Sequence, residues 1–254
     1  MTFIIAEAGV NHNGDIGHAI RLCNAAKEAG ADAVKFQHFN SHRLWGDDRI
    51  AHLELGNEGM AEVARYCRDA GIEFMCTPFG VPEVKFLAPM LKRMKVASGC
   101  LTRFDLLAAV RATGLPVILS TGMADMDRIA KTLDILGTAT LLHCTSAYPC
   151  PVSEVNLAAM DALRARWGAS CKVGYSDHTS GIVIALAAVA RGAEVLEKHL
   201  TLDRGQEGPD HKSSIEPKEF RIMVEAIRTI EQAIGHPEKR LQASEAATAK
   251  AWYA

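Results

Sequence analysis

The 254-residue sequence predicts a (β/α)8 TIM barrel, an α/β fold, as a single domain. Two observations lead to this prediction. Short apolar runs alternate eight times with longer segments of helical spacing, and most of those segments end in glycine. A doubly wound parallel sheet is the alternative, but the eight units are evenly spaced and no GxGxxG turn follows the first run.

The expected strands are apolar or β-branched runs. In chain order they are FIIAEAG (3–9), AVKFQ (33–37), EFMCTPF (73–79), RMKVASG (93–99), VILSTG (117–122), ATLLHCT (139–145), KVGYSDH (172–178) and EVLEKHL (194–200). The helices between them are expected to stop at the glycines of CNAAKEAG, YCRDAG, RATG, DILG, RARWG and AVARG. We expect the barrel to cover residues 1–237 and a short tail to cover residues 238–254.

Composition narrows the class of protein. A hydrophobic fraction of 48% and a charged fraction of 23% are typical of a soluble globular chain. The net charge of −2 leaves no basic surface for nucleic acid or an anionic membrane, so neither is expected as a partner. The N-terminus has no basic segment followed by a long apolar run, which predicts a cytoplasmic protein. The seven cysteines show no CxxC spacing, and we expect most of them to be buried free thiols.

Polar side chains cluster where the expected strands end. In a TIM barrel these C-terminal strand ends meet in one mouth, which carries the active site. Buried charges are costly unless they are paired or bind a ligand, so this ring predicts a polar site. Its members are Glu7, Asn11, His12, Asn13, Lys35, Gln37, Thr77, Lys95, Ser98, Ser120, Thr121, His143, Thr145, Ser146, Tyr148, Ser176, Asp177, His178, Glu197, Lys198 and His199.

Two parts of this ring indicate chemistry. His178 and His199 end neighbouring strands, so they are placed to share a divalent metal, with Asp210 or Glu7 as an oxygen donor; a hydrogen-bonded histidine pair is the alternative. The second part combines two lysines with small hydroxyl groups, which is what a phosphate or carboxylate requires. This predicted anion site consists of Lys35, Thr77, Lys95, Ser98, Ser120 and Ser176.

Ordered motifs along nearly the whole chain closely resemble the sialic acid synthase family. They are IIAEAGVNHNGD, AGADAVKFQ, TPF, KVASG, PVILSTGM, LLHCTSAYPCP, VGYSDHT, GAEVLEKHLTLDR and GPDHKSS. The resemblance implies a TIM-barrel transferase that condenses phosphoenolpyruvate with an amino-sugar aldehyde. It also implies a divalent metal (manganese, magnesium or similar), C–O rather than P–O cleavage, and a product that is a 3-deoxy-2-ulosonic acid. We further expect a homodimer or higher homo-oligomer.

The resemblance also implies roles for single residues. The metal ligands of the family fall on His178 and His199, and the sugar-binding carboxylates fall on Glu7 and Asp210. The implied contacts to phosphoenolpyruvate are Lys35, Thr77, Lys95, Ser98, Ser120, Ser146, Tyr148 and Ser176, where Ser146 replaces an asparagine. In this scheme the metal polarises the aldehyde, the lysines hold the enolpyruvyl anion, and water attacks its C2.

Three departures from the family concern the acceptor. Cys100 occupies the place of a glutamate that serves as an acid or base, and we keep it as a candidate catalytic residue. The tail at 238–254 resembles the start of a linker, and the antifreeze-like domain that would follow it is expected to be missing. Polar residues between positions 37 and 58 are candidates for binding a different acceptor. They are His38, Asn40, His42 and Arg43.

Two other functions stay open on the sequence. A class I aldolase would form a Schiff base on a barrel lysine, with Lys95 or Lys198 as the candidate. A catalytically silent barrel that serves as a binding or scaffold subunit is the other. The intact histidine pair and the two lysines of the predicted anion site argue against the second alternative.

Overall fold

The computed structural model describes residues 1–253 and confirms the predicted barrel. The eight strands are β1 (Phe3–Gly9), β2 (Ala33–His38), β3 (Glu73–Pro78), β4 (Met94–Val96), β5 (Val117–Ser120), β6 (Thr140–His143), β7 (Val173–Asp177) and β8 (Val195–His199). Each lies at its predicted position, within about three residues at the ends. The largest difference is β4, because Ser98–Cys100 forms a 3-10 turn instead of extending the strand.

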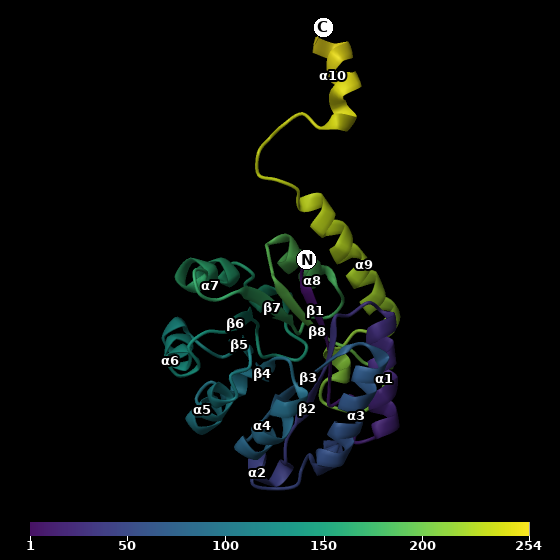
Figure 1. Cartoon of the computed structure of the whole chain (residues 1–254). Coiled ribbons are helices and arrows are strands. Elements are labelled where there is room, and N and C mark those ends of the chain that lie inside the picture. Colours follow the sequence, from purple (N-terminus) through teal and green to yellow (C-terminus); the bar gives the residue numbers. More distant parts are fainter. Residues whose placement is uncertain (254) are drawn as a thin grey trace.

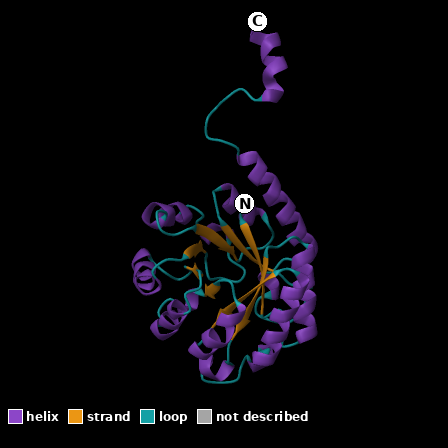
Figure 2. Cartoon of the chain, in the orientation of Figure 1, coloured by secondary structure: helices purple, strands orange, loops and turns teal. Residues whose placement is uncertain are grey.

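Helices follow the strands and surround them (Figures 1 and 2). They are α1 (Ile16–Glu28), α2 (Ser41–Trp45), α3 (Gly56–Ala70), α4 (Val81–Leu87), α5 (Phe104–Ala112), α6 (Met126–Leu136), α7 (Ala159–Trp167), α8 (Val183–Ala190), α9 (Pro217–Ile234) and α10 (Ala246–Tyr253). The predicted stop glycines have positive φ after α1, α3, α5, α6 and α8. After α7 the prediction is wrong in detail, since Gly168 keeps a right-handed φ of −60°.

All recorded strand pairs are parallel, in the order β3-β2-β1-β8-β7-β6-β5-β4. The two end strands, β3 and β4, also lie beside each other, so the barrel is nearly closed. Parallel pairing brings all C-terminal strand ends to one rim, which is the condition for the predicted ring of polar groups.

The core has two layers. The larger layer packs the outward faces of the strands against the helices. The smaller one fills the barrel interior and consists of Ile5, Ala33, Met75, Ile118, Leu142 and Val195, with Phe3 packed against it. Because side chains alternate along a strand, the same inward row that holds these residues continues two positions later with the polar residues of the mouth.

The chain leaves the barrel at the end opposite the mouth. The last turns of α9 contact the start of β1, where the backbone N–H of Thr2 donates to Glu231. The segment after α9 then extends away and carries the exposed helix α10 (Figure 1). The predicted tail at 238–254 is described up to residue 253, and residue 254 lies outside the described residues. Within residues 1–253, no helix combines the length and apolarity needed to cross a membrane. All seven cysteines are free and buried, as predicted.

Candidate active site

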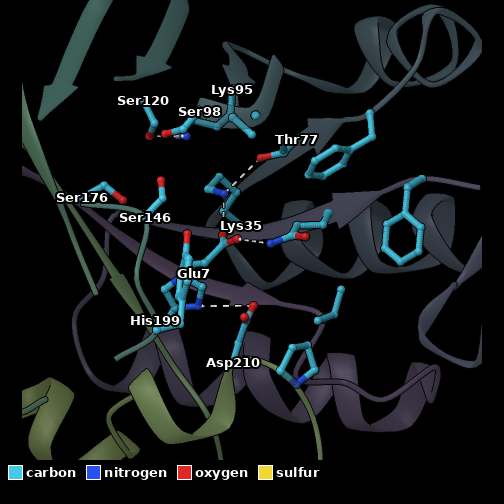
Figure 3. A pocket seen from close by; sticks show the side chains of 18 of the residues that line it. Glu7, Lys35, Thr77, Lys95, Ser98, Ser120, Ser146, Ser176, His199 and Asp210 are labelled. Atoms are coloured by element: carbon cyan, nitrogen blue, oxygen red, sulfur yellow. Dashed lines mark hydrogen bonds and ion pairs between the residues drawn. The ribbon is translucent and has the colours of Figure 1, made fainter. Parts of the chain in front are cut away.

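A cavity of about 540 Å³ opens at the C-terminal ends of the strands. Its lining includes every residue of the predicted metal and anion sites, together with Glu7, Ser146, Tyr148 and Asp210, but not Cys100. Figure 3 shows the polar side chains converging on the cavity. These residues come from different strands and from the loops that follow them, so only the closed barrel brings them together. Most of the polar lining forms what we call the floor, which consists of Glu7, Lys35, Gln37, Thr77, Lys95, Ser98, Ser120, Ser146, Ser176, Glu197, His199 and Asp210.

Two buried lysines and two buried glutamates form the centre of the floor. Lys35 Nζ lies 2.6 Å from Glu7 Oε2 and 3.6 Å from Glu197 Oε2, and it donates to Thr77 Oγ1 at 3.1 Å. Lys95 Nζ donates to Ser120 Oγ at 2.7 Å, while its nearest carboxylate, that of Glu197, is 3.9 Å away. Lys95 is therefore the less neutralised of the two cations, and its charge is available to an anionic ligand.

The environments of the carboxylates push their pKa values apart. Burial raises the pKa of Glu7 to about 7, although the charge of Lys35 opposes the rise. Burial also acts on Glu197, but Lys35 and Lys95 outweigh it and lower its pKa to about 2. Asp210, half-buried at the rim, has a pKa raised to about 6 by desolvation. Glu197 thus stays ionised between the lysines, while Glu7 and Asp210 can exchange protons near neutral pH.

Serine hydroxyls border the lysines on one side of the cavity (Figure 3). Ser176 Oγ donates to Glu197 at 2.8 Å, and Ser98 Oγ accepts from the backbone N–H of Gly122 at 3.0 Å. Ser146 Oγ is buried and has no hydrogen-bond partner. A Cβ at Gly122 would collide with Ser146 Oγ, so glycine allows this close approach. An unpartnered buried hydroxyl beside two lysines is a ready donor for an anion.

The two predicted metal histidines lie together. The ring centroids of His178 and His199 are 5.5 Å apart, and the ring of Tyr148 packs 4.2 Å from that of His178. His178 Nδ1 donates to the carbonyl of Thr145 at 2.7 Å, which leaves the lone pair on Nε2. His199 Nδ1 is buried without a hydrogen-bond partner and lies 3.6 Å from Asp210 Oδ2.

Both imidazole rings favour the neutral form, which is the form that binds a metal cation. Burial lowers the pKa of His178, and burial together with the neighbouring ring lowers that of His199 well below its ordinary value of 6.5. Neutral imidazoles are metal ligands, so the pair fits a divalent cation. Within residues 1–253, no three His, Cys, Asp or Glu side chains are grouped closely enough to form a complete metal site. Two imidazoles would leave coordination positions free for water or substrate oxygen.

Known proteins of similar sequence and fold belong to one enzyme family. The family model described as NeuB family matches residues 22–239. N,N'-diacetyllegionaminic acid synthase of Campylobacter jejuni is 41% identical over 96% of this chain and 80% of its own length. Human N-acetylneuraminate-9-phosphate synthase is 36% identical over 94% of this chain and 73% of its own. The structure of N-acetylneuraminic acid synthetase from Leptospira borgpetersenii, in complex with citrate, superposes with a TM-score of 0.91, at 37% identity, over 98% of this chain and 90% of that one.

The chain belongs to the NeuB family. The resemblance seen in the sequence is thereby confirmed, and the chain is an enzyme of the sialic acid synthase type.

Some members of the predicted polar ring do not face the cavity of this NeuB-family enzyme. Asp177 and Lys198 point to the other side of their strands, where Lys198 Nζ lies 2.9 Å from Asp177 Oδ2 in a fully buried pair. His143 Nε2 lies 2.8 Å from the carbonyl of Val155, also outside the cavity. The ring was predicted without regard to the alternation of side chains along a strand, which sends every second residue outward.

Cys100 is likewise not brought to the cavity. The 3-10 turn Ser98–Cys100 directs its side chain into the hydrophobic core, where 2% of the residue is exposed. Burial raises the pKa of the thiol above its ordinary value of 9.0. A buried, protonated thiol outside the cavity cannot replace the glutamate of the family by direct contact with substrate.

Glu197 and Gln37 contribute more to the site than was predicted from the sequence. Glu197 was placed in the ring but given no role, although it contacts both lysines and Ser176. Gln37, whose Nε2 donates to Glu7 Oε1 at 3.1 Å, was treated in the same way. Their inward positions on β8 and β2, two residues beyond Val195 and Lys35, were the available signal.

Proposed function

We propose that this NeuB-family enzyme condenses phosphoenolpyruvate with an open-chain sugar aldehyde, giving a 3-deoxy-2-ulosonic acid and inorganic phosphate. The observation that carries the proposal is the pair of buried lysines bordered by serine hydroxyls on the floor, beside carboxylates whose pKa values lie near neutrality. The names of the relatives, synthases of N,N'-diacetyllegionaminic acid and N-acetylneuraminate 9-phosphate, support a product of this class.

In the proposed reaction, Lys35 and Lys95 bind the carboxylate and phosphate of phosphoenolpyruvate by charge-assisted hydrogen bonds. The hydroxyls of Ser98 and Ser146 supply further donors. These contacts hold the enolpyruvyl C3 toward the aldehyde carbon, which turns an encounter of two substrates into a reaction within one complex.

The bond changes follow from this arrangement. C3 of phosphoenolpyruvate forms a bond to the aldehyde carbon, and the aldehyde oxygen takes up a proton. Water adds to C2, the C2–O bond to phosphate breaks, and C2 becomes the new ketone. Glu7 and Asp210 are the groups that move these protons, because their raised pKa values let them both give and accept a proton near pH 7.

A divalent cation fits the two neutral imidazoles, and we propose His178 and His199 as its protein ligands. When bound, such a cation would supply Lewis-acid polarisation of a substrate oxygen. Asp210, 3.6 Å from His199 Nδ1, would orient that ring.

The proposed reaction is tested with phosphoenolpyruvate labelled with ¹⁸O in the bridging position. In the presence of Mn²⁺ and an N-acylated hexosamine we expect the label to appear in the released phosphate, as C–O cleavage requires. Label retained in the organic product, or no phosphate release with any sugar aldehyde, contradicts the proposal. Borohydride treatment with pyruvate is expected to trap no lysine adduct, since Lys198 is paired with Asp177 outside the cavity and Lys95 is bonded to Ser120.

The metal ligands are tested separately. His178→Ala and His199→Ala are each expected to lose bound Mn²⁺ on metal analysis and to reduce kcat/KM by about 10³-fold, the order expected for loss of Lewis-acid stabilisation. His236→Ala, a change of an exposed histidine after α9, is the matched control and should keep both. Full metal content in both site variants would show that the histidines are only a hydrogen-bonded pair.

A further inference from the structure

Polar side chains near the mouth but outside the cavity form two kinds of contact. Four of them, which the sequence suggested as acceptor ligands, do not line the cavity and each contacts a residue of the region between β2 and α4 instead; they are His38, Asn40, His42 and Arg43. Asp177 and Lys198 differ, because they form an ion pair between two neighbouring strands, β7 and β8. Both side chains are fully buried, and neither lines the cavity. The proposed chemistry therefore does not use this pair directly.

Each member of the ion pair directly precedes one of the two candidate metal ligands in the chain. Asp177 precedes His178, and Lys198 precedes His199. The recorded register of β7 and β8 ends with Asp177 opposite Lys198. Because side chains alternate along a strand, the ion pair lies on the outer side of the sheet while the two imidazoles that follow line the cavity. The pair thus joins the two strands at the last position before the histidines.

The ion pair also encloses the backbone of His178. Asp177 Oδ1 accepts hydrogen bonds from the backbone N–H of Thr179 at 2.9 Å and from its hydroxyl at 2.8 Å. Lys198 Nζ donates to Asp177 Oδ2 at 2.9 Å and to the carbonyl of Thr179 at 2.5 Å. His178 stands between Asp177 and Thr179 in the chain, so both of its neighbours are bonded to the same ammonium group. These bonds fix the direction in which the backbone carries the His178 ring.

The two imidazole rings depend on this backbone for their relative placement. His178 Nδ1 donates to the carbonyl of Thr145 at 2.7 Å, and the backbone carbonyl of His199 accepts from the N–H of Ile215 at 2.9 Å. A shift of the end of β7 relative to β8 would change the separation of the ring centroids, which is 5.5 Å. A cation is bound at fixed distances from its ligands, so its affinity depends on how the ligands are held.

A buried ion pair contributes little net stability. Removing two charges from water costs about as much as their attraction returns, and apolar side chains of similar volume are often equally good or better. The hydrogen bonds of such a pair are nevertheless directional and connect particular atoms. A pair of this kind at the ends of two strands therefore specifies position more than it stabilises the fold.

We propose that Asp177 and Lys198 are a positioning pair, which sets the orientation of His178 and its spacing from His199 for the binding of a divalent cation. The inference rests on the metal site of the proposed function. It adds two residues that act through the histidines without touching metal or substrate.

Two variants separate positioning from stability. Lys198→Met removes both bonds of the ammonium group and leaves the carboxylate of Asp177 buried and unpaired. The double variant Asp177→Leu/Lys198→Met replaces the pair with apolar side chains, so its stability in urea should be close to that of the wild type. Arg93→Met is the matched control, because it breaks an ion pair at the other end of the barrel, where Arg93 Nε lies 2.7 Å from Glu73 Oε1.

Metal affinity is measured by titration with Mn²⁺, and the orientation of His178 in metal-free protein by ¹⁵N NMR of its Nδ1–H group, assigned with His178→Ala. We expect Lys198→Met and the double variant to weaken Mn²⁺ binding by about 10- to 100-fold, the range for groups that orient a metal ligand. The Nδ1–H signal should be lost or exchange faster in both. Arg93→Met should change neither quantity. Phosphoenolpyruvate binding without metal should be unchanged in all three, and the double variant decides if Lys198→Met does not fold.

The outcomes separate this inference from the proposed function. If the histidines bind Mn²⁺, wild-type Mn²⁺ affinity in the folded double variant overturns the inference, and so does an unchanged Nδ1–H signal. An equal loss of Mn²⁺ affinity in Arg93→Met, or a parallel loss of phosphoenolpyruvate affinity in the double variant, also overturns it, because the effect would then not be specific to the histidines. If the Nδ1–H signal changes but His178→Ala and His199→Ala keep full metal content, the proposed metal site fails while the positioning of His178 stands.

Discussion

The two ends of the barrel interior are built on the same inward rows of side chains but differ completely in chemistry. Toward the N-terminal end the row is apolar and packed, with Ile5 and Val195 in the inner cluster. Two residues further along the same strands stand Glu7 and Glu197, buried and charged, on the floor of the cavity. Apolar residues that stabilise the barrel and polar residues of the candidate active site are thus only two positions apart along a strand, about 7 Å.

The two ends of the barrel also differ in how their polar groups are hydrogen-bonded. At the N-terminal end, Arg228 donates to the carbonyl of Thr2 and pairs with Asp32 and Glu231, so α9 is bonded to β1. At the mouth, two buried polar atoms have neither a hydrogen-bond partner nor an ion pair within hydrogen-bond distance; they are Ser146 Oγ and His199 Nδ1. Unpartnered polar groups lower stability, so their concentration at one end indicates selection for ligand binding there.

The largest expected effect is on the free energy of unfolding and comes from a substitution at the N-terminal, apolar end of the barrel interior. Leu142→Ala removes a fully buried side chain of the inner cluster and should lower the free energy of unfolding by about 2–5 kcal/mol. The dissociation constant for phosphoenolpyruvate should stay unchanged under conditions where the variant is folded. Urea unfolding and calorimetry measure the two quantities.

Leu241→Ala, in the exposed segment after α9, is the control and should change neither quantity. A large loss of phosphoenolpyruvate affinity in folded Leu142→Ala protein would show that the two ends are not independent.

Substitutions at the mouth of the barrel should instead affect phosphoenolpyruvate binding more than stability. Lys95→Met and Lys35→Ala each remove a charge-assisted contact and should weaken phosphoenolpyruvate binding by about 1.5–3 kcal/mol. For Lys95→Met the free energy of unfolding should stay equal or rise, because burial lowers the pKa of Lys95 and its charged form therefore costs stability at neutral pH. Calorimetry and urea unfolding test both parts.

Lys131→Met, at an exposed position of α6, is the matched control. Unchanged phosphoenolpyruvate affinity in both site variants would show that the two lysines do not bind phosphoenolpyruvate. Strong destabilisation of Lys95→Met would show that Lys95 stabilises the fold.

The smallest expected effect is the pH dependence of stability that Glu231 contributes at the N-terminal end of the barrel. Contacts with Thr2 and Arg228 outweigh partial burial and lower the pKa of Glu231 below its ordinary value of 4.5. Its contribution is therefore present above pH 4.5 and is lost as the pH falls through the folded-state pKa. Glu231→Gln should cost about 1 kcal/mol at pH 7, and the difference from wild type should vanish in acid.

Urea unfolding between pH 3 and pH 7 measures this difference, with Glu225→Gln on the exposed face of α9 as the control. A cost for Glu231→Gln that is the same at both ends of the pH range would mean that the charge of the carboxylate contributes nothing.

Much of the site could be predicted from the sequence because parallel barrel strands impose a common rim. Lys35 lies within a strand, and Ser120 and His199 end theirs; this was enough to predict that the three lie together at the mouth, although they are distant in the chain. The prediction went wrong at Lys198 and Cys100. Lys198 lies one position out of phase with the inward row, and Cys100 lies on a turn that was taken for the end of a strand region.

By itself, then, the sequence determined the eight-unit barrel, the family and the residues of the floor, because these depend on periodicity and on motifs that are local in the chain. Only the tertiary structure decided the surroundings of those residues. The placement of Glu197 between two lysines depends on the closure of the barrel, because the three residues stand on different strands. The burial of Cys100 in the outer core and the packing of Phe39 with Leu44 and Ile50 depend on how the loops after the strands fold. Such packing is a balance of many small contacts between segments distant in the chain, and no local pattern encodes it.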